Sequence, residues 1–269
     1  MNTPILVTGG TGTIGRHVTR LLHEAGHDIR VLTRHPRESA PGIEHVAGDT
    51  TKGEGLGAAV AGVETVLHLA GGSKGDDVAA RHLVAAAQAA GVQHLVLISV
   101  IGADTMPIGY FRMKYAAEQE VANSGIPFSI LRVAQLHDFV LPVVRTMARM
   151  PLAPAPRGLR FEPVAVEEVA ARLTGIALGA PAGQVPDLAG PEVLDIADLI
   201  RAYNEKQGRR RALLPLRLPG AAGRAYRAGD NLAGDAAVRG DLTWAEFLAA
   251  DTRELPGLTP TPPAPRPRR

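Results

Sequence analysis

The sequence predicts an α/β fold: a doubly wound parallel sheet covered by helices on both faces, with a small C-terminal lobe. Short apolar runs typical of buried strands alternate with amphipathic helical segments along the first half of the 269-residue chain. The first run, at residues 5–8, leads directly into a glycine-dense turn and then into a helical segment that opens at Thr13. We expect one domain at residues 1–134, a lobe interleaved with it at 135–255, and a disordered Pro/Arg tail at 256–269.

The composition excludes several classes of protein. The chain has no cysteine, so disulfides and cysteine–zinc sites are ruled out. No apolar run approaches the roughly 20 residues of a membrane span. The formal charge of +2 includes three tail arginines, and +2 − 3 leaves −1 for the rest, so we expect no basic face for nucleic acid. These features predict a cytoplasmic monomer or homodimer with no metal ion, nucleic acid or membrane as partner.

The glycine-dense turn has the spacing and the context of a dinucleotide-binding site. Gly9 can adopt the backbone angles of a tight turn, Gly12 leaves room for a pyrophosphate, and Gly15 lets the helix lie close to the strand. The helix N-terminus offers free N–H groups and a partial positive charge to the phosphates. The alternative is an ordinary glycine turn of an α/β protein. The residues expected to hold the cofactor here are Gly9, Thr11, Gly12, Thr13, Ile14 and Gly15.

The end of the second strand indicates which cofactor is bound. This strand is predicted at residues 28–33 and leads into Arg34, with His35 and Arg37 beside it and no carboxylate before Glu38. An acidic residue at this point favours a ribose 2′-hydroxyl, whereas an arginine accommodates a 2′-phosphate. The sequence therefore predicts NADP(H), and NAD(H) is the less favoured cofactor.

Two further strands end in residues suited to the same ligand. The third strand, residues 43–48, is followed by a short polar pair that would bond the adenine edge or, alternatively, form a turn or helix cap. The fourth strand, residues 64–69, leads into small residues that let the chain pass close to the ribose and nicotinamide. The carboxyl ends of parallel strands share one edge of a sheet, so we expect one site. The residues expected to contact the cofactor at these strand ends are Asp49, Thr50, Leu69, Ala70 and Gly71.

The fifth strand, predicted at residues 94–99, delivers Ser99 to the same edge, and a helix with Tyr110 and Lys114 follows. Tyrosine and lysine four residues apart share one helical face, an arrangement that alone is typical of a surface helix. A nearby ammonium stabilises a phenolate, so we expect Lys114 to lower the pKa of Tyr110 from its ordinary value of about 10. A phenol tuned in this way protonates a carbonyl oxygen as hydride arrives, while Ser99 bonds the same oxygen.

Together the glycine turn, Arg34, Ser99 and Tyr110-x-x-x-Lys114 resemble the short-chain dehydrogenase/reductase superfamily. The compact substrate half, and the run from Tyr110 into Ala-Ala-Glu and then residues 126–132, are similar to its atypical NmrA-like NAD(P)-binding branch. The resemblance covers residues 4 to about 180. It implies a Rossmann-like fold, NADP(H) as cofactor, and catalytic positions at Ser99, Tyr110 and Lys114, with Lys114 also holding the nicotinamide ribose.

These motifs and the resemblance are compatible with two functions. The first is an NADPH-dependent oxidoreductase of the short-chain dehydrogenase/reductase type, with hydride transfer to a small carbonyl or quinone-like substrate. The second is a non-catalytic NADP(H)-binding redox sensor, because some NmrA-like proteins bind the dinucleotide without known catalysis. A sugar-nucleotide epimerase or dehydratase is disfavoured, since the substrate half is small for a nucleotide sugar.

The second half of the chain departs from the regular alternation. After a sixth strand at residues 128–132, the segment 135–139 is expected near the cleft, with His137 a proton relay or, alternatively, a packing residue. Residues 140–150 would line a substrate pocket or form a lid, and a proline-rich connector follows. Strands at 161–166, 184–188 and 213–218 and helices at 167–178 and 195–207 are expected to form the lobe over the nicotinamide side, followed by a weak helix at 220–233 and a closing helix at 243–250.

Overall fold

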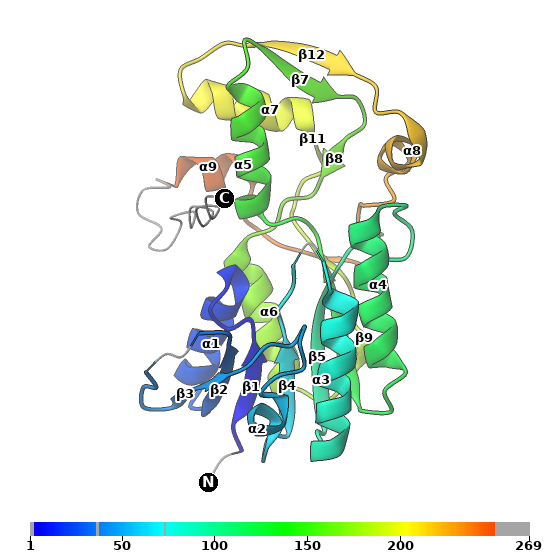
Figure 1. The fold of residues 1–269 in the computed structure, drawn as a ribbon. Coiled ribbons are helices and arrows are strands. Elements are labelled where there is room, and N and C mark those ends of the chain that lie inside the picture. The colour runs from blue at the N-terminus through cyan, green and yellow to red at the C-terminus, as the bar shows by residue number, and fades with distance from the viewer. Residues whose placement is uncertain (1–2, 36–37, 73, 251–269) are drawn as a thin grey trace, which may run out of the picture.

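The computed structural model describes residues 3–35, 38–72 and 74–250 (Figure 1). The strands of its main sheet are β1 (Ile5–Thr8), β2 (Ile29–Thr33), β3 (Ile43–Ala47), β4 (Thr65–His68), β5 (His94–Val100), β6 (Phe128–Val133), β9 (Gly183–Gln184), β10 (Leu188–Ala189) and β13 (Val238–Arg239). They pair in parallel in the order β13-β10-β6-β5-β4-β1-β2-β3, with β9 also paired to β6. The order β3-β2-β1-β4-β5-β6 is that of a Rossmann-like doubly wound sheet, which confirms the predicted fold class.

Helices cover both faces of this sheet. They are α1 (Thr13–Glu24) and α6 (Val166–Leu178) on one face, and α2 (Leu56–Val60), α3 (Asp76–Ala90) and α4 (Gly109–Ala122) on the other. Because side chains alternate along a strand, β1 contributes to both cores. Val7 packs with α1 and α6, Leu6 packs with the helices of the opposite face, and both are fully buried.

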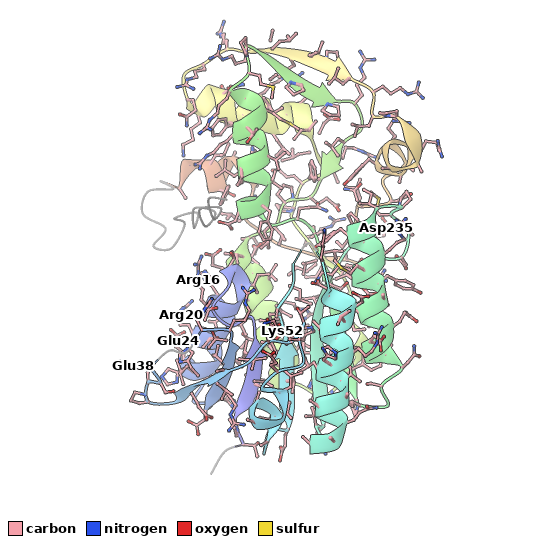
Figure 2. The ribbon with its side chains drawn as sticks, viewed as in Figure 1. Arg16, Arg20, Glu24, Glu38, Lys52 and Asp235 are labelled. Atoms are coloured by element: carbon pink, nitrogen blue, oxygen red, sulfur yellow. The ribbon has the colours of Figure 1, made fainter. Side chains whose placement is uncertain are left out.

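The two sides of α1 fix its orientation on the sheet. Val18 and Leu22 are fully buried against the strands. Arg20 and Glu24 lie on the outer side, where they form an ion pair of 2.8 Å one helical turn apart (Figure 2). The helix therefore runs back along the sheet with its N-terminus at the carboxyl edge, directly after the turn that follows β1.

The second half of the chain builds a lobe at the carboxyl edge of the sheet (Figure 1). Its elements are α5 (His137–Ala148), β7 (Leu152–Pro156), β8 (Arg160–Phe161), β11 (Leu194–Asp195), α7 (Ile196–Lys206), β12 (Ala212–Leu216), α8 (Gly220–Ala228) and α9 (Trp244–Ala249). Its core contains Val144 from α5, Leu199 from α7 and Trp244 from α9. Residues 140–148 therefore pack mainly into this core.

Three predicted elements of the lobe differ from the structure. The predicted helix 167–178 is α6, which packs with α1 on the main sheet because Val169 and Leu173 face that core. The predicted strand 184–188 is split into β9 and β10, which also join the main sheet, since Pro186 has no N–H to donate to a ladder. The predicted strand 161–166 is reduced to β8.

The proline-rich segment predicted as a connector is a strand instead. It forms β7, which pairs in parallel with β12 in a sheet of two strands. Each strand of such a pair has an outer edge, and a proline there costs no ladder hydrogen bond. The helix predicted to end at residue 233 ends at Ala228, where Gly229 has a φ of +87°. The predicted tail at 256–269 lies outside the described residues.

Within the described part of the chain, no helix combines the length and the apolar character needed to cross a membrane.

Candidate cofactor-binding and active site

Two adjoining pockets lie at the carboxyl edge of the main sheet and share the glycine turn. The first pocket, about 390 Å³, extends over the ends of β1, β2 and β4, and the second, about 760 Å³, lies between β5, β6, α4 and the lobe. Of the predicted site residues, Gly9, Thr11, Gly12, Arg34, Asp49, Thr50, Leu69, Ala70 and Gly71 line the first pocket. Residues Gly9, Gly12, Thr13, Ile14, Gly15, Leu69, Gly71, Ser99, Tyr110 and Lys114 line the second.

Two positions in the turn require glycine. Gly9 has a φ of +70°, and a Cβ there would lie 2.6 Å from the Ala70 nitrogen. A Cβ on Gly15 would lie 2.0 Å from the Gly9 carbonyl oxygen and 2.6 Å from the Gly10 Cα. The expectation that Gly15 lets the helix approach the strand is therefore corrected: the close approach is to the turn.

The start of α1 is open toward the pockets. Its N-cap is Gly12, which has extended backbone and no side chain to accept a hydrogen bond. The Gly12 N–H donates to the Gly9 carbonyl oxygen at 2.9 Å, which closes the turn. No side chain of the described residues caps the N–H groups of the first helical turn. These N–H groups and the helix dipole suit an anionic group bound at the helix N-terminus.

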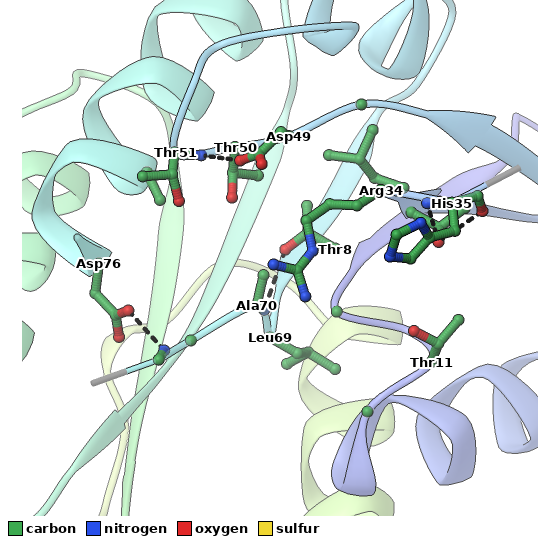
Figure 3. A pocket seen from close by; sticks show the side chains of 18 of the residues that line it. Thr8, Thr11, Arg34, His35, Asp49, Thr50, Thr51, Leu69, Ala70 and Asp76 are labelled. Carbon is green, nitrogen blue, oxygen red and sulfur yellow. Dashed lines mark hydrogen bonds between the residues drawn. The ribbon is translucent and has the colours of Figure 1, made fainter. Parts of the chain in front are cut away.

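Charged and polar side chains line the part of the first pocket formed by the ends of β2 and β3 (Figure 3). Arg34 directly follows β2, is exposed, and reaches into this pocket. Asp49 Oδ1 accepts hydrogen bonds from the N–H groups of Thr51 at 2.8 Å and Lys52 at 3.3 Å. This carboxylate oxygen therefore holds a turn, which is the alternative role predicted for Asp49. Arg37 lies outside the described residues.

A buried hydrogen-bond chain holds the loop after β4 against the turn after β1. The Ala70 N–H donates to Thr8 Oγ1 at 3.3 Å, and Thr8 Oγ1 lies 2.7 Å from His68 Nδ1. Burial, reinforced by the charge of Lys114 and opposed by that of Asp76, lowers the pKa of His68 to about 4. The ring is therefore neutral, and the tautomer of His68 decides whether Nδ1 accepts from the Thr8 hydroxyl or donates to it. Sequence reasoning missed His68, whose only signal is its position at the end of an apolar strand.

The three predicted catalytic side chains meet at the second pocket. Ser99 is 1% exposed, and its Oγ has no hydrogen-bond partner among the described residues. Tyr110 lies in the first turn of α4 and is 38% exposed, with its ring edge against Phe111 at a centroid distance of 5.5 Å. Lys114, one turn later, is buried. The cavity thus contains an unpaired hydroxyl, a phenol and an ammonium.

The ammonium has a partner that the sequence did not predict. Lys114 Nζ lies 2.9 Å from Asp76 Oδ2, and the two side chains are 10% and 6% exposed. The other oxygen of Asp76 accepts the Gly72 N–H at 2.8 Å (Figure 3). Sequence analysis did not single out Asp76, because the packing of α3 against α4 that brings it to Lys114 leaves no local pattern.

The pKa of Tyr110 differs from the expectation based on Lys114. Burial, and next the charge of Asp76, raise the pKa of Tyr110 to about 12. The expectation of a lowered pKa is wrong, because burial disfavours the phenolate and the charge of Asp76 adds to this effect. The Tyr110 hydroxyl is therefore protonated at ordinary pH.

Apolar side chains form most of the remaining wall of the second pocket. Phe139 comes from α5, Phe161 from β8 and Tyr226 from α8, so three separate parts of the lobe contribute. Gln135 also lines the cavity, and its Oε1 is buried without a hydrogen-bond partner among the described residues. The prediction that the segment after β6 lies near the cleft is confirmed for Gln135, Leu136 and Phe139.

Of the two roles predicted for His137, proton relay and packing residue, its contacts fit the packing role. Its ring stacks on Trp244 and Phe247 at centroid distances of 5.8 and 4.7 Å, and its Nε2 lies 3.1 Å from the Leu242 carbonyl oxygen. Burial lowers its pKa, so the ring is neutral. In the described part of the chain, no cluster of three or more His, Asp or Glu side chains is arranged to hold a metal ion.

Comparison with known proteins adds three findings. A family model described as NAD(P)H-binding matches residues 9–158. The NAD(P)H azoreductase of Xenophilus azovorans is 37% identical over 134 residues, which are 48% of this chain and 46% of that protein. Quinone oxidoreductase 2 of Escherichia coli (strain K12) is 31% identical over 135 residues, 48% of this chain and 47% of that protein. The chain thus spans about half the length of the curated relatives it matches.

Solved structures extend the likeness to the whole fold. The NADPH-dependent quinone oxidoreductase from Escherichia coli, complexed with NADPH, has a TM-score of 0.78 at 22% identity and covers 91% of this chain and 98% of its own. MoeE5 in complex with UDP-glucose and NAD has a TM-score of 0.70 at 19% identity and covers 91% and 96%. Likeness at this identity establishes the fold. With the family match over more than half of its length, the chain belongs to the NAD(P)H-binding family, in the atypical branch of the short-chain dehydrogenase/reductase superfamily.

Proposed function

We propose that this protein is an NADPH-dependent oxidoreductase that transfers hydride to a small carbonyl or quinone-like substrate. The observation that carries the proposal is the grouping of Ser99, Tyr110 and Lys114 around one largely apolar cavity that opens onto the glycine turn. The names of two relatives, an azoreductase and a quinone oxidoreductase, support a reductase.

The residues of the first pocket fit a pyridine dinucleotide. The glycine turn and the uncapped start of α1 would receive the pyrophosphate, and the close contacts of Gly9 and Gly15 leave no room for larger residues. Thr50 and the loop at Leu69 and Ala70 would flank the adenosine and the ribose. Arg34 would pair with a 2′-phosphate, which favours NADPH over NADH.

The residues of the second pocket fit a proton-coupled reduction. NADPH, when bound, supplies the hydride. The O–H groups of Tyr110 and Ser99 would both donate to the substrate carbonyl oxygen, and the Tyr110 proton would transfer to it as the carbonyl carbon is reduced. Phe139, Phe161 and Tyr226 offer aromatic walls to a flat apolar substrate, which suits a quinone-like compound.

Substitution of Tyr110 by phenylalanine tests this proposal. NADPH consumption is followed across a panel of carbonyl and quinone substrates, and NADPH affinity is measured in parallel. We expect Tyr110→Phe to lower kcat by about 10²- to 10⁴-fold, the usual contribution of a general acid, with the Kd for NADPH retained. The matched control is Tyr115→Phe on the same helix, at 39% exposure, which should leave turnover intact.

Equal turnover in wild type and Tyr110→Phe would remove the tyrosine from the chemistry. Tight NADPH binding with no turnover on any substrate, and tighter binding of one redox state, would instead favour the redox-sensor function.

A further inference from the structure

We propose that the end of the lobe built by β7 and β12 is a peripheral docking surface for an anionic lipid bilayer. The observations that carry this inference are an apolar sheet face exposed to solvent and a group of exposed cations at both of its ends. The inference goes beyond the proposed function and does not depend on it, because neither pocket includes a residue of these strands. It replaces the expectation that the protein has no membrane partner.

The register of β7 and β12 gives their small sheet one entirely apolar outer face. Successive side chains of a strand point to opposite faces, and paired residues of parallel strands share a face. Ala153 and its partner Leu213 point inward, where Ala153 is fully buried in the lobe core and Leu213 packs against it. The residues of the outer face are Leu152, Pro154, Pro156, Ala212, Leu214 and Leu216.

Most of this outer face is open to solvent. Leu152 is 45% exposed, Leu214 and Leu216 are each 39% exposed, and only Pro156 is buried. Figure 1 shows the two strands at the end of the lobe that points away from the main sheet, where a flat partner can reach them. Exposed leucines grouped on one face indicate an interaction surface, whereas leucines scattered singly over a protein do not.

Positive charge gathers at both ends of the outer face. Arg209, Arg210 and Arg211 directly precede β12, while Arg157 and Arg217 directly follow the two strands. The Arg157 N–H donates to the Leu216 carbonyl oxygen at 2.8 Å, which holds the two strand ends together.

The near-neutral total charge of the sequence conceals this basic face. Residues 149–157 and 206–217 together contain seven lysines and arginines and no aspartate or glutamate, and +2 − 7 leaves −5 for the rest of the chain. All seven side chains are exposed, and none forms an ion pair with another residue that the structure describes. Their charge is therefore available to an anionic partner.

An anionic bilayer matches this combination better than other partners do. Acidic headgroups attract the flanking cations, and the leucines between them enter the boundary between headgroups and acyl chains. A second copy of the chain, docked through the same face, would bring two sets of cations together. A nucleic acid would match the cations, but bases bind single strands by stacking on aromatic side chains, and the outer face has none.

Vesicle flotation with the purified full chain tests the inference. The two vesicle compositions are phosphatidylcholine alone and phosphatidylcholine mixed with phosphatidylglycerol. We expect partition into the anionic vesicles, little partition into phosphatidylcholine alone, and weaker binding as ionic strength rises from about 0.01 to about 0.15 M. Failure of the wild-type protein to bind the anionic vesicles at low ionic strength would overturn the inference.

Two double variants test the role of the cations. We expect Arg210→Gln/Arg211→Gln to lower the partition coefficient about twentyfold, at about fivefold for each cation. The matched control is Arg20→Gln/Arg81→Gln, which removes the same charge from α1 and α3, where the side chains are 56% and 59% exposed. The control should bind as wild type; equal losses would mean attraction to the net charge of the protein and would overturn the assignment to this face.

A further pair of variants tests the apolar part of the face. Leu214→Gln should lower the partition coefficient about threefold to tenfold, since a leucine no longer enters the bilayer. Leu178→Gln at the end of α6, with a similar exposure of 43%, is its control and should bind as wild type. Thermal unfolding followed by circular dichroism checks that each variant is folded.

Three other outcomes would overturn the bilayer as partner. Unchanged partition in both Arg210→Gln/Arg211→Gln and Leu214→Gln would place the binding elsewhere on the chain. Binding of a single-stranded oligonucleotide that is lost in the arginine variant, with vesicle binding unaffected by Leu214→Gln, would favour a nucleic acid. A dimer in sedimentation velocity that Leu214→Gln dissociates would favour a second copy of the chain.

Discussion

Several side chains of this cleft are held by buried neighbours, whereas Arg34 is exposed and reaches the first pocket from the end of β2. A guanidinium at this place would pair with a 2′-phosphate and not with a 2′-hydroxyl. We therefore propose that Arg34 contributes to the choice between the two cofactors.

We predict that Arg34→Ala weakens NADPH binding about tenfold to a hundredfold, the loss of a charge-assisted hydrogen bond to phosphate, and leaves NADH binding nearly unchanged. Calorimetric titration with both cofactors measures the two affinities. Arg20→Ala, which removes an equal charge from the outer side of α1, controls for the long-range field. Equal losses for NADPH and NADH would exclude Arg34 from 2′-phosphate recognition.

The residues that sequence could place were those at strand ends. Arg34 and Ser99 were found because β-strand order in a doubly wound sheet brings the carboxyl ends together whatever the loops do. Asp76 and His68 were missed, since their partners Lys114 and Thr8 come from other elements and no spacing records the contact. The pKa of Tyr110 was predicted in the wrong direction, because its burial and the nearby charge of Asp76 both arise from tertiary packing.

Among the elements, α1 and the turn before it are packed tightly against each other. The helix begins directly against the turn, with no space for a Cβ on Gly15, and its N–H groups open toward both pockets. The position of the helix end and the shape of the turn are therefore coupled.

A methyl group at this junction should separate the two elements. We predict that Gly15→Ala lowers the free energy of unfolding by about 1 to 3 kcal/mol, the usual cost of overpacking, and abolishes tight NADPH binding. Gly175→Ala in α6 is the control, since its Cβ would meet no atom within 4 Å; in a helix interior it should stabilise by about 0.5 to 1 kcal/mol. Urea unfolding measures both, and unchanged stability and binding in Gly15→Ala would refute the coupling.

Helices and strands were predicted correctly where the segment itself has an apolar run or a periodic pattern of apolar residues. Five of the six strands from β1 to β6 are largely buried apolar runs, and the edge strand β3 is the exception, with no buried residue. The order of the strands follows from the alternation with helices. The two-residue strands β8, β9 and β10 are too short to show any period. The strand β7 was missed because its prolines are typical of a connector, and only its pairing with β12 makes it a strand.

In the whole molecule, we propose that the sheet supplies the surface for the cofactor and the lobe supplies the wall for the substrate. The first pocket is built from the ends of adjacent strands, so its residues could be predicted. The second is closed by Phe139, Phe161 and Tyr226 from distant parts of the lobe, and their meeting depends on tertiary packing. The strand ends therefore predict a site for NAD(P)H, whereas the wall of the second pocket leaves no local sequence pattern.

We propose that the glycine turn and its surrounding strand ends hold NADPH. Isothermal titration calorimetry of the purified chain, at two temperatures and with NADPH and NADH in turn, tests this assignment. We expect saturable heat for one site per chain, with tighter binding of NADPH than of NADH. Absence of binding heat from either cofactor at both temperatures would exclude a dinucleotide site at this turn.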